Sequence, residues 1–145
     1  MSTAQNDLSP LPAFWRRVFW VELPIVALTV LYWIVDPHGF LKQTFAIDPA
    51  PQGAVFLLWA YAAAVFTLVF YFYARMLYFP VVHVPTFRAY QEGLLLGDVL
   101  IVIIYAWAAL SGTVNAATAW ASVGMATFWG SVRVVFLVRT KLPAP

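Results

Sequence analysis

Four apolar stretches, each long enough to cross a lipid bilayer, constrain the fold of this sequence more than any other feature. A membrane-spanning helix needs about 20 predominantly apolar residues. Stretches of this kind cover about residues 14–35, 54–79, 92–110 and 116–138. Hydrophobic residues make up 63% of the 145-residue chain and charged residues 10%, an excess that a soluble domain of this size has too little interior to bury. The sequence therefore predicts an integral membrane protein.

The expected fold is an all-α bundle of four transmembrane helices forming one domain over residues 14–138. Residues 1–13 and 139–145 are short tails at the two ends. Five of the ten prolines fall in the predicted connections and four in the tails, where a missing N–H does least harm. Pro24 is the exception, because it lies inside the first stretch and predicts a kink there.

The positions of the basic residues predict the orientation of the chain. With four spans, seven of the eight Lys and Arg residues fall on one side of the membrane and only Lys42 falls on the other. Positive charge is enriched on the cytoplasmic side. We therefore expect both termini to be cytoplasmic and the loop of residues 36–53 to face outward. A bacterial inner or intracytoplasmic membrane fits this pattern.

Four charges lie within the apolar stretches: Glu22, Arg75, Asp98 and Arg133. A charge at the centre of a membrane helix costs about 2.5 to 3.5 kcal/mol on insertion scales and marks a candidate functional site. Because successive spans run in opposite directions, a rise of about 1.5 Å per residue places all four in one layer on the cytoplasmic side. They form the predicted intramembrane charge network.

Two interpretations of this network compete. In the first, the two arginines pair with the two carboxylates and fix the register of the helices. In the second, Glu22 or Asp98 titrates during proton or cation movement, which requires a water path. A carboxylate beside an arginine is held in its charged form, which opposes proton carriage. The first interpretation is therefore favoured.

Candidate ligand-binding residues are sparse. His38 and His83 fall on opposite sides of the predicted bilayer, so a haem held by both is excluded, while a ligand shared with another chain stays open. Tyr71 and Tyr105 are further candidates in the apolar stretches. We predict no metal site and no intrinsic cofactor. Contact with lipid is expected, and contact with a pigment or quinone is a weaker hypothesis, because the aromatic residues also suit interfacial anchoring.

Small residues in the last stretch predict close helix packing. Alanine and glycine let helix backbones approach each other in membranes. The predicted packing residues are Ala117, Ala121, Gly124, Ala126 and Gly130. A bundle of four helices has a limited interior, so we expect some of these faces to meet another chain.

No motif of a known catalytic class is present, and the chain has no cysteine, which excludes thiol and disulfide chemistry. An enzyme is therefore not expected, and neither is binding to nucleic acid. The favoured function is a non-catalytic accessory subunit of a larger membrane complex, with photosynthetic or respiratory electron-transfer complexes as hosts. Its partners would be other membrane subunits and lipids. The alternatives are a small homo-oligomeric transporter or channel using Glu22 and Asp98, and a pigment- or haem-binding subunit.

Overall fold

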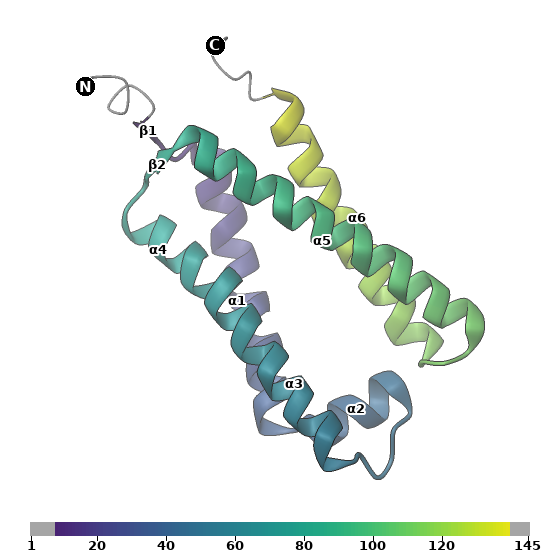
Figure 1. The fold of residues 1–145 in the computed structure, drawn as a ribbon. Coiled ribbons are helices and arrows are strands. Elements are labelled where there is room, and N and C mark those ends of the chain that lie inside the picture. Colours follow the sequence, from purple (N-terminus) through teal and green to yellow (C-terminus); the bar gives the residue numbers. More distant parts are fainter. Residues whose placement is uncertain (1–7, 140–145) are drawn as a thin grey trace. The chain divides into compact units, whose positions relative to one another are not determined.

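The computed structural model describes residues 8–139, which form six α-helices, one π-helical segment and two short strands (Figure 1). In chain order they are β1 (Leu8–Pro10), α1 (Ala13–Val35), α2 (Pro37–Phe45), α3 (Gln52–Val65), η1 (Phe66–Tyr71), α4 (Phe72–Tyr78), β2 (Val81–His83), α5 (Val84–Ser111) and α6 (Ala116–Arg139). The chain divides into two compact units, Leu8–Val82 and the described residues from His83 onward. Each unit is described by itself.

The described residues contain four helical stretches long and apolar enough to cross a membrane, as the sequence predicts. They are Ala13–Val35, Gln52–Tyr78, Val84–Ser111 and Ala116–Arg139. The second comprises α3, η1 and α4 in direct succession. Length and composition thus indicate a membrane protein.

Two connections are more ordered than hydropathy suggests. Helix α5 begins at Val84, well before the apolar stretch that starts near residue 92. Pro85 lies in its first turn, where a proline ring favours a helix, and Arg88 Nε donates to Glu92 Oε1 at 3.0 Å one turn later. The predicted outer loop contains α2, whose N-terminus is capped by Asp36 accepting from the Gly39 N–H at 2.9 Å. Hydropathy locates apolar spans, whereas capping residues and proline set where these helices begin.

The expectation of a purely helical chain is incomplete, because β1 pairs with β2 in a two-stranded sheet. Next to β1, the Leu11 N–H donates to the Pro80 carbonyl at 2.7 Å, and the Leu11 side chain is buried. Residues 8–13 of the predicted N-terminal tail are therefore fixed against the segment after α4. Residues 1–7 and 140–145 of the predicted tails lie outside the described residues.

In the first unit, α1 packs along α3, η1 and α4, and α2 contacts both α1 and α3 (Figure 1). The rings of Phe19 and Tyr73 stack with centroids 4.3 Å apart, and both side chains are fully buried. Near α2, Leu41 forms a second apolar cluster with Val55 and Leu58. Aromatic stacking and this cluster therefore hold α1 against the second spanning stretch.

The second unit is a helical hairpin in which α5 and α6 pack side by side (Figure 1). Gly112 ends α5 with φ at 69°, a left-handed conformation that suits glycine. Asn115 then begins α6, since its Oδ1 accepts from the N–H groups of Ala117 and Thr118 at 3.0 and 3.3 Å. The short turn brings the facing sides of the two helices together.

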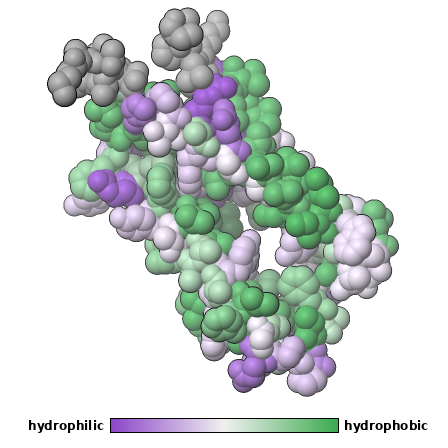
Figure 2. Space-filling view, in the orientation of Figure 1, coloured by the Kyte–Doolittle hydropathy of each residue, from purple (hydrophilic) through white to green (hydrophobic). Residues whose placement is uncertain are grey.

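Large apolar side chains cover much of the outer surface. Figure 2 shows hydrophobic residues along the visible sides of the helices, with hydrophilic residues mainly near the ends of the helices. Leu96, Ile104 and Trp107 on α5 are each about 60% exposed. Soluble proteins rarely leave so much apolar area in water, so lipid or protein must cover these faces.

Candidate functional site

The strongest polar feature of the hairpin is an ion pair between α5 and α6. Arg133 Nη1 donates to Asp98 Oδ2 at 2.7 Å, and the two side chains are 4% and 16% exposed. A charge in a low-dielectric site needs such a partner, because an unpaired buried charge is far more costly than a pair. The pair therefore ties the two helices together at one register.

A glycine lies against this ion pair. A Cβ atom placed on Gly130 would lie 3.5 Å from Asp98 Cβ and 3.6 Å from Leu95 Cδ1. One turn earlier, Ala126 is 5% exposed and belongs to the same interface side of α6. These two predicted packing residues are buried in the structure. Ala119, which the sequence analysis does not single out, is also fully buried.

The other three predicted packing residues lie on the opposite side of α6. Ala117, Ala121 and Gly124 are exposed, and a Cβ atom on Gly124 would meet no atom within 4 Å. At 100° per residue they are turned about half a circle away from Ala126 and Gly130. Helix α6 thus has two small-residue faces, one packed against α5 and one turned away from it.

Helix α5 has a comparable face that the sequence analysis does not identify. Gly93 and Gly97 have the Gly-x-x-x-Gly spacing typical of close contacts between membrane helices. A Cβ atom on either glycine would meet nothing within 4 Å. The spacing is visible in the sequence, but only the structure shows that this face is separate from the one carrying Asp98.

The two remaining charges differ in environment. Arg75 is exposed in the last turn of α4, and its guanidinium lies 3.7 Å from the centroid of the Phe79 ring. This cation–π contact suits a side chain reaching from a helix end toward the interface. Glu22, by contrast, is only 5% exposed within α1. The predicted placement of all four charges in one layer stays a prediction.

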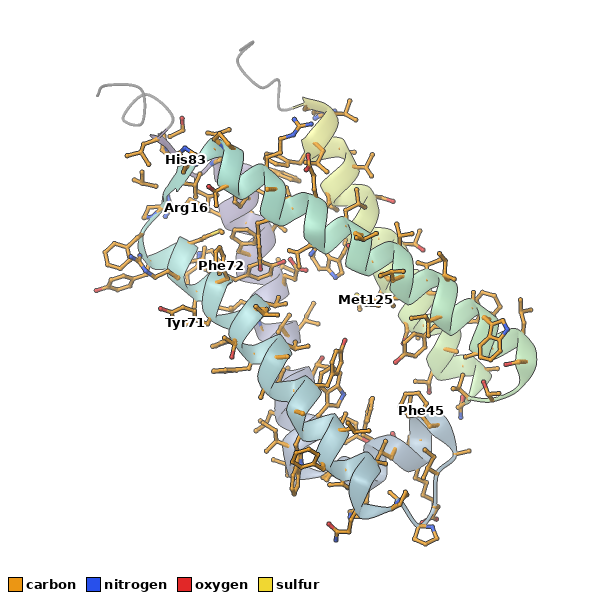
Figure 3. The ribbon with its side chains drawn as sticks, viewed as in Figure 1. Arg16, Phe45, Tyr71, Phe72, His83 and Met125 are labelled. Atoms are coloured by element: carbon orange, nitrogen blue, oxygen red, sulfur yellow. The ribbon has the colours of Figure 1, made fainter. Side chains whose placement is uncertain are left out.

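The candidate ligand residues lie on separate elements. His38 is exposed on α2, and Tyr71 is 59% exposed on η1 (Figure 3). His83 precedes α5, and its Nδ1 lies 2.8 Å from Thr86 Oγ1, a contact that orders the first turn of the helix. Tyr105 is 22 residues further along, about 33 Å at 1.5 Å per residue. His83 and Tyr105 therefore cannot contact one small ligand together.

An irregular backbone segment within the second span is a further feature absent from the sequence analysis. The six residues of η1 adopt a π-helix, a form that is rare and common at functional sites. Near its start, Thr67 Oγ1 donates to the Ala63 carbonyl at 2.9 Å. Thr29 makes the same bond to the Ile25 carbonyl within the regular helix α1, so this bond is not specific to the π-helix.

No family model, curated protein or solved structure matches the chain. Within residues 8–139, no three His, Cys, Asp or Glu side chains lie close enough together to hold a metal ion. The chemistry that the hairpin offers is a charge-assisted hydrogen bond between two helices and two uncovered faces of small residues. These features serve the association of helices.

Proposed function

We propose that the protein is a non-catalytic accessory subunit of a larger membrane protein complex. The observation that supports this proposal is a pair of small-residue faces on the hairpin that point away from the contact between α5 and α6, Gly93 with Gly97 on α5 and Ala117, Ala121 and Gly124 on α6. Membrane helices associate through such faces because lipid provides no hydrophobic force between them. Each face offers a neighbouring subunit a close backbone contact.

The ion pair supports a structural role for the charged residues. The Asp98 carboxylate accepts a hydrogen bond from Arg133 at 2.7 Å, and both side chains are largely buried between the two helices. Asp98 is thereby engaged in holding α5 to α6. The transporter alternative would require this contact to open during each cycle.

We further propose that the four spans form one bundle with both termini in the cytoplasm of a bacterium. The distribution of basic residues supports this orientation. An energy-transducing electron-transfer complex is the proposed host, since an aromatic-rich subunit without catalytic groups suits such an assembly. In this role the chain would contact lipids and neighbouring subunits, and pigment or quinone only through the host.

Orientation can be tested with single cysteines, because the native chain has none. Gln43→Cys in α2 and Thr86→Cys at the start of α5 replace exposed residues. An impermeant maleimide added to intact cells should label Gln43→Cys and should label Thr86→Cys only after permeabilisation. The reverse pattern would contradict the proposed topology.

The subunit role can be tested by substitution within the uncovered faces. Gly97→Leu should lower the fraction of chain that co-migrates with the host complex on native gels, since a leucine blocks close approach of helices. Gly53→Leu is the matched control, because Gly53 also faces open space but lies at the start of α3. Glu22→Gln and Asp98→Asn should retain incorporation with lower stability. Equal incorporation of Gly97→Leu and Gly53→Leu would contradict the proposal.

A further inference from the structure

The first unit contains an apolar groove that the proposed function does not use. It has a volume of about 420 Å³, within the usual range of small-molecule sites, about 300–1,000 Å³. Its lining residues are Ile34, Trp59, Ala62, Ala63 and Phe66. Ile34 belongs to α1 and the others to α3 and the start of η1. The groove therefore lies where the first two spans meet.

The residue pattern explains the shape of the groove. Trp59 and Phe66 are seven residues apart on one face of the second span, about 10 Å along the helix axis. Between them on the same face lie Ala62 and Ala63, whose methyl groups leave the space that the two rings bound. The groove is thus a short slot with an alanine floor and two aromatic ends.

The position of the slot along the second span indicates its depth in the membrane. The second span runs from Gln52 to Tyr78, so Trp59 and Phe66 are its eighth and fifteenth residues. The slot therefore extends from the third turn of the span to its middle. Ile34, Trp59 and Phe66 are each about half exposed, so the slot is open along one side. This stretch of the span lies at the depth of the hydrocarbon layer.

The side chains that line the slot limit the kind of molecule that it can hold. Apart from the Trp59 indole N–H, no lining side chain has a hydrogen-bonding group, so the slot has little to hold a quinone ring or a lipid headgroup. A second membrane helix is also a poor fit, because helix contacts use small residues whereas Trp59 and Phe66 project at both ends. A flexible hydrocarbon chain fits a narrow, open and apolar slot.

We propose that this groove binds an acyl chain of a membrane phospholipid, which stays with the protein when it is extracted. Recognition is through shape and dispersion contacts with the alanine floor and the aromatic ends. The headgroup makes no contribution within the slot. The proposal concerns the first unit only and is independent of the host complex.

The experiment uses the full chain in nanodiscs containing a phospholipid with a photoreactive diazirine on its acyl chain. After illumination, mass spectrometry maps the labelled residues of the second span. Trp59, Ala63 and Phe66 should be labelled several-fold more than Leu57, Tyr61 and Ala64 on other sides of the same helix. Phosphatidylcholine and phosphatidylglycerol probes should give the same pattern. Uniform labelling around the helix, or labelling by only one headgroup, would overturn the proposal.

Matched variants distinguish a bound chain from general contact with lipid. Ala63→Phe fills the slot, whereas Ala64→Phe places the same side chain at the next exposed position outside the lining. Labelling of Trp59 should fall several-fold in Ala63→Phe and stay unchanged in Ala64→Phe. If Ala63→Phe loses helix content by circular dichroism, a second matched pair can be used. In that pair Phe66→Ala alters the slot and Phe56→Ala is the exposed control. Equal labelling in either matched pair would contradict the assignment.

Two other occupants would also be detected. A polyene in the slot would give a visible absorption spectrum in the purified protein, and the proposal predicts a colourless preparation. A second measurement pairs Ala63→Cys with single cysteines along α6. Efficient disulfide formation there would show that the chain's own hairpin covers the slot, which would overturn lipid binding.

Discussion

Asp98 and Arg133 depend on each other, because each would be a poorly hydrated charge without its partner. Removing one member of a buried pair typically costs about 3–5 kcal/mol, whereas replacing both by apolar residues is often close to neutral. We expect Asp98→Ala and Arg133→Ala each to destabilise the protein by an amount in this range. The double variant Asp98→Leu with Arg133→Met should recover most of the loss. Denaturation in mixed detergent micelles measures these differences.

Arg75 provides the control for that cycle. It is exposed and contacts the Phe79 ring, so Arg75→Met should cost less than about 1 kcal/mol, as expected for an exposed cation–π contact. A double variant Asp98→Leu with Arg133→Met that recovers none of the loss seen in the single variants would show that the two residues do not stabilise each other.

Lys42 and Asp48 form a second ion pair outside the spans, with Nζ and Oδ2 2.6 Å apart. The hydrogen bond to Asp48, followed by its negative charge, raises the pKa of Lys42 above its usual 10.5. The stabilisation from this pair should therefore be complete below pH 10.5 and be lost as pH rises through the higher folded-state pKa. An NMR titration of the Lys42 side chain should show this shift, and Asp48→Asn should abolish it. An unchanged pKa in Asp48→Asn would contradict the pairing.

At the scale of the element, the two small-residue faces of α6 have different surroundings. The facing side of Gly130 has space for a methyl group in ordinary contact with Asp98 and Leu95, but for nothing larger. Gly130→Leu should therefore separate α5 from α6 and cost about 1–3 kcal/mol, the usual cost of overpacking. Thermal unfolding of the purified chain measures this loss.

Gly124→Leu is the matched variant on the opposite face. A Cβ atom there meets nothing within 4 Å and points away from α5, so the hairpin should unfold at an unchanged temperature. Incorporation into the host complex should fall instead. A stability loss in Gly124→Leu equal to that of Gly130→Leu would contradict the division of α6 into an inner and an outer face.

The sequence predicts some elements well for physical reasons. A long apolar stretch must be helical in a membrane, so the four spanning helices follow from hydropathy alone. Helix α2 and the first turns of α5 depend instead on Asp36, Pro37 and Pro85, which hydropathy ignores. The pairing of β1 with β2 depends on two segments far apart in the chain. Its formation is a tertiary property that no local pattern indicates.

For a similar reason, the sequence identifies some residues of the candidate site but not the contacts between them. A charge in an apolar stretch is conspicuous, which makes Asp98 and Arg133 identifiable, but their contact depends on the register of the hairpin. Helical periodicity places Ala117 and Ala126 on opposite faces, yet only the packing of α5 shows which of the two is buried. The groove beside Ala63 requires the approach of α1 and has no sequence signature.

At the scale of the whole molecule, large apolar side chains are exposed along all four spans of the described chain. Its spans bury few side chains within the structure, and one small-residue face on each helix of the hairpin points away from the contact between α5 and α6. Its buried ion pair joins helices. These properties are the ones expected of a subunit whose outer faces are completed by lipid and by other proteins.

Gentle extraction of the native membrane, followed by native mass determination of the particle containing this chain, tests that account most directly. We predict a particle that contains other membrane subunits in fixed stoichiometry and from which Gly97→Leu dissociates more readily than Gly53→Leu. A particle composed only of copies of this chain and lipid, with both variants alike, would contradict the account.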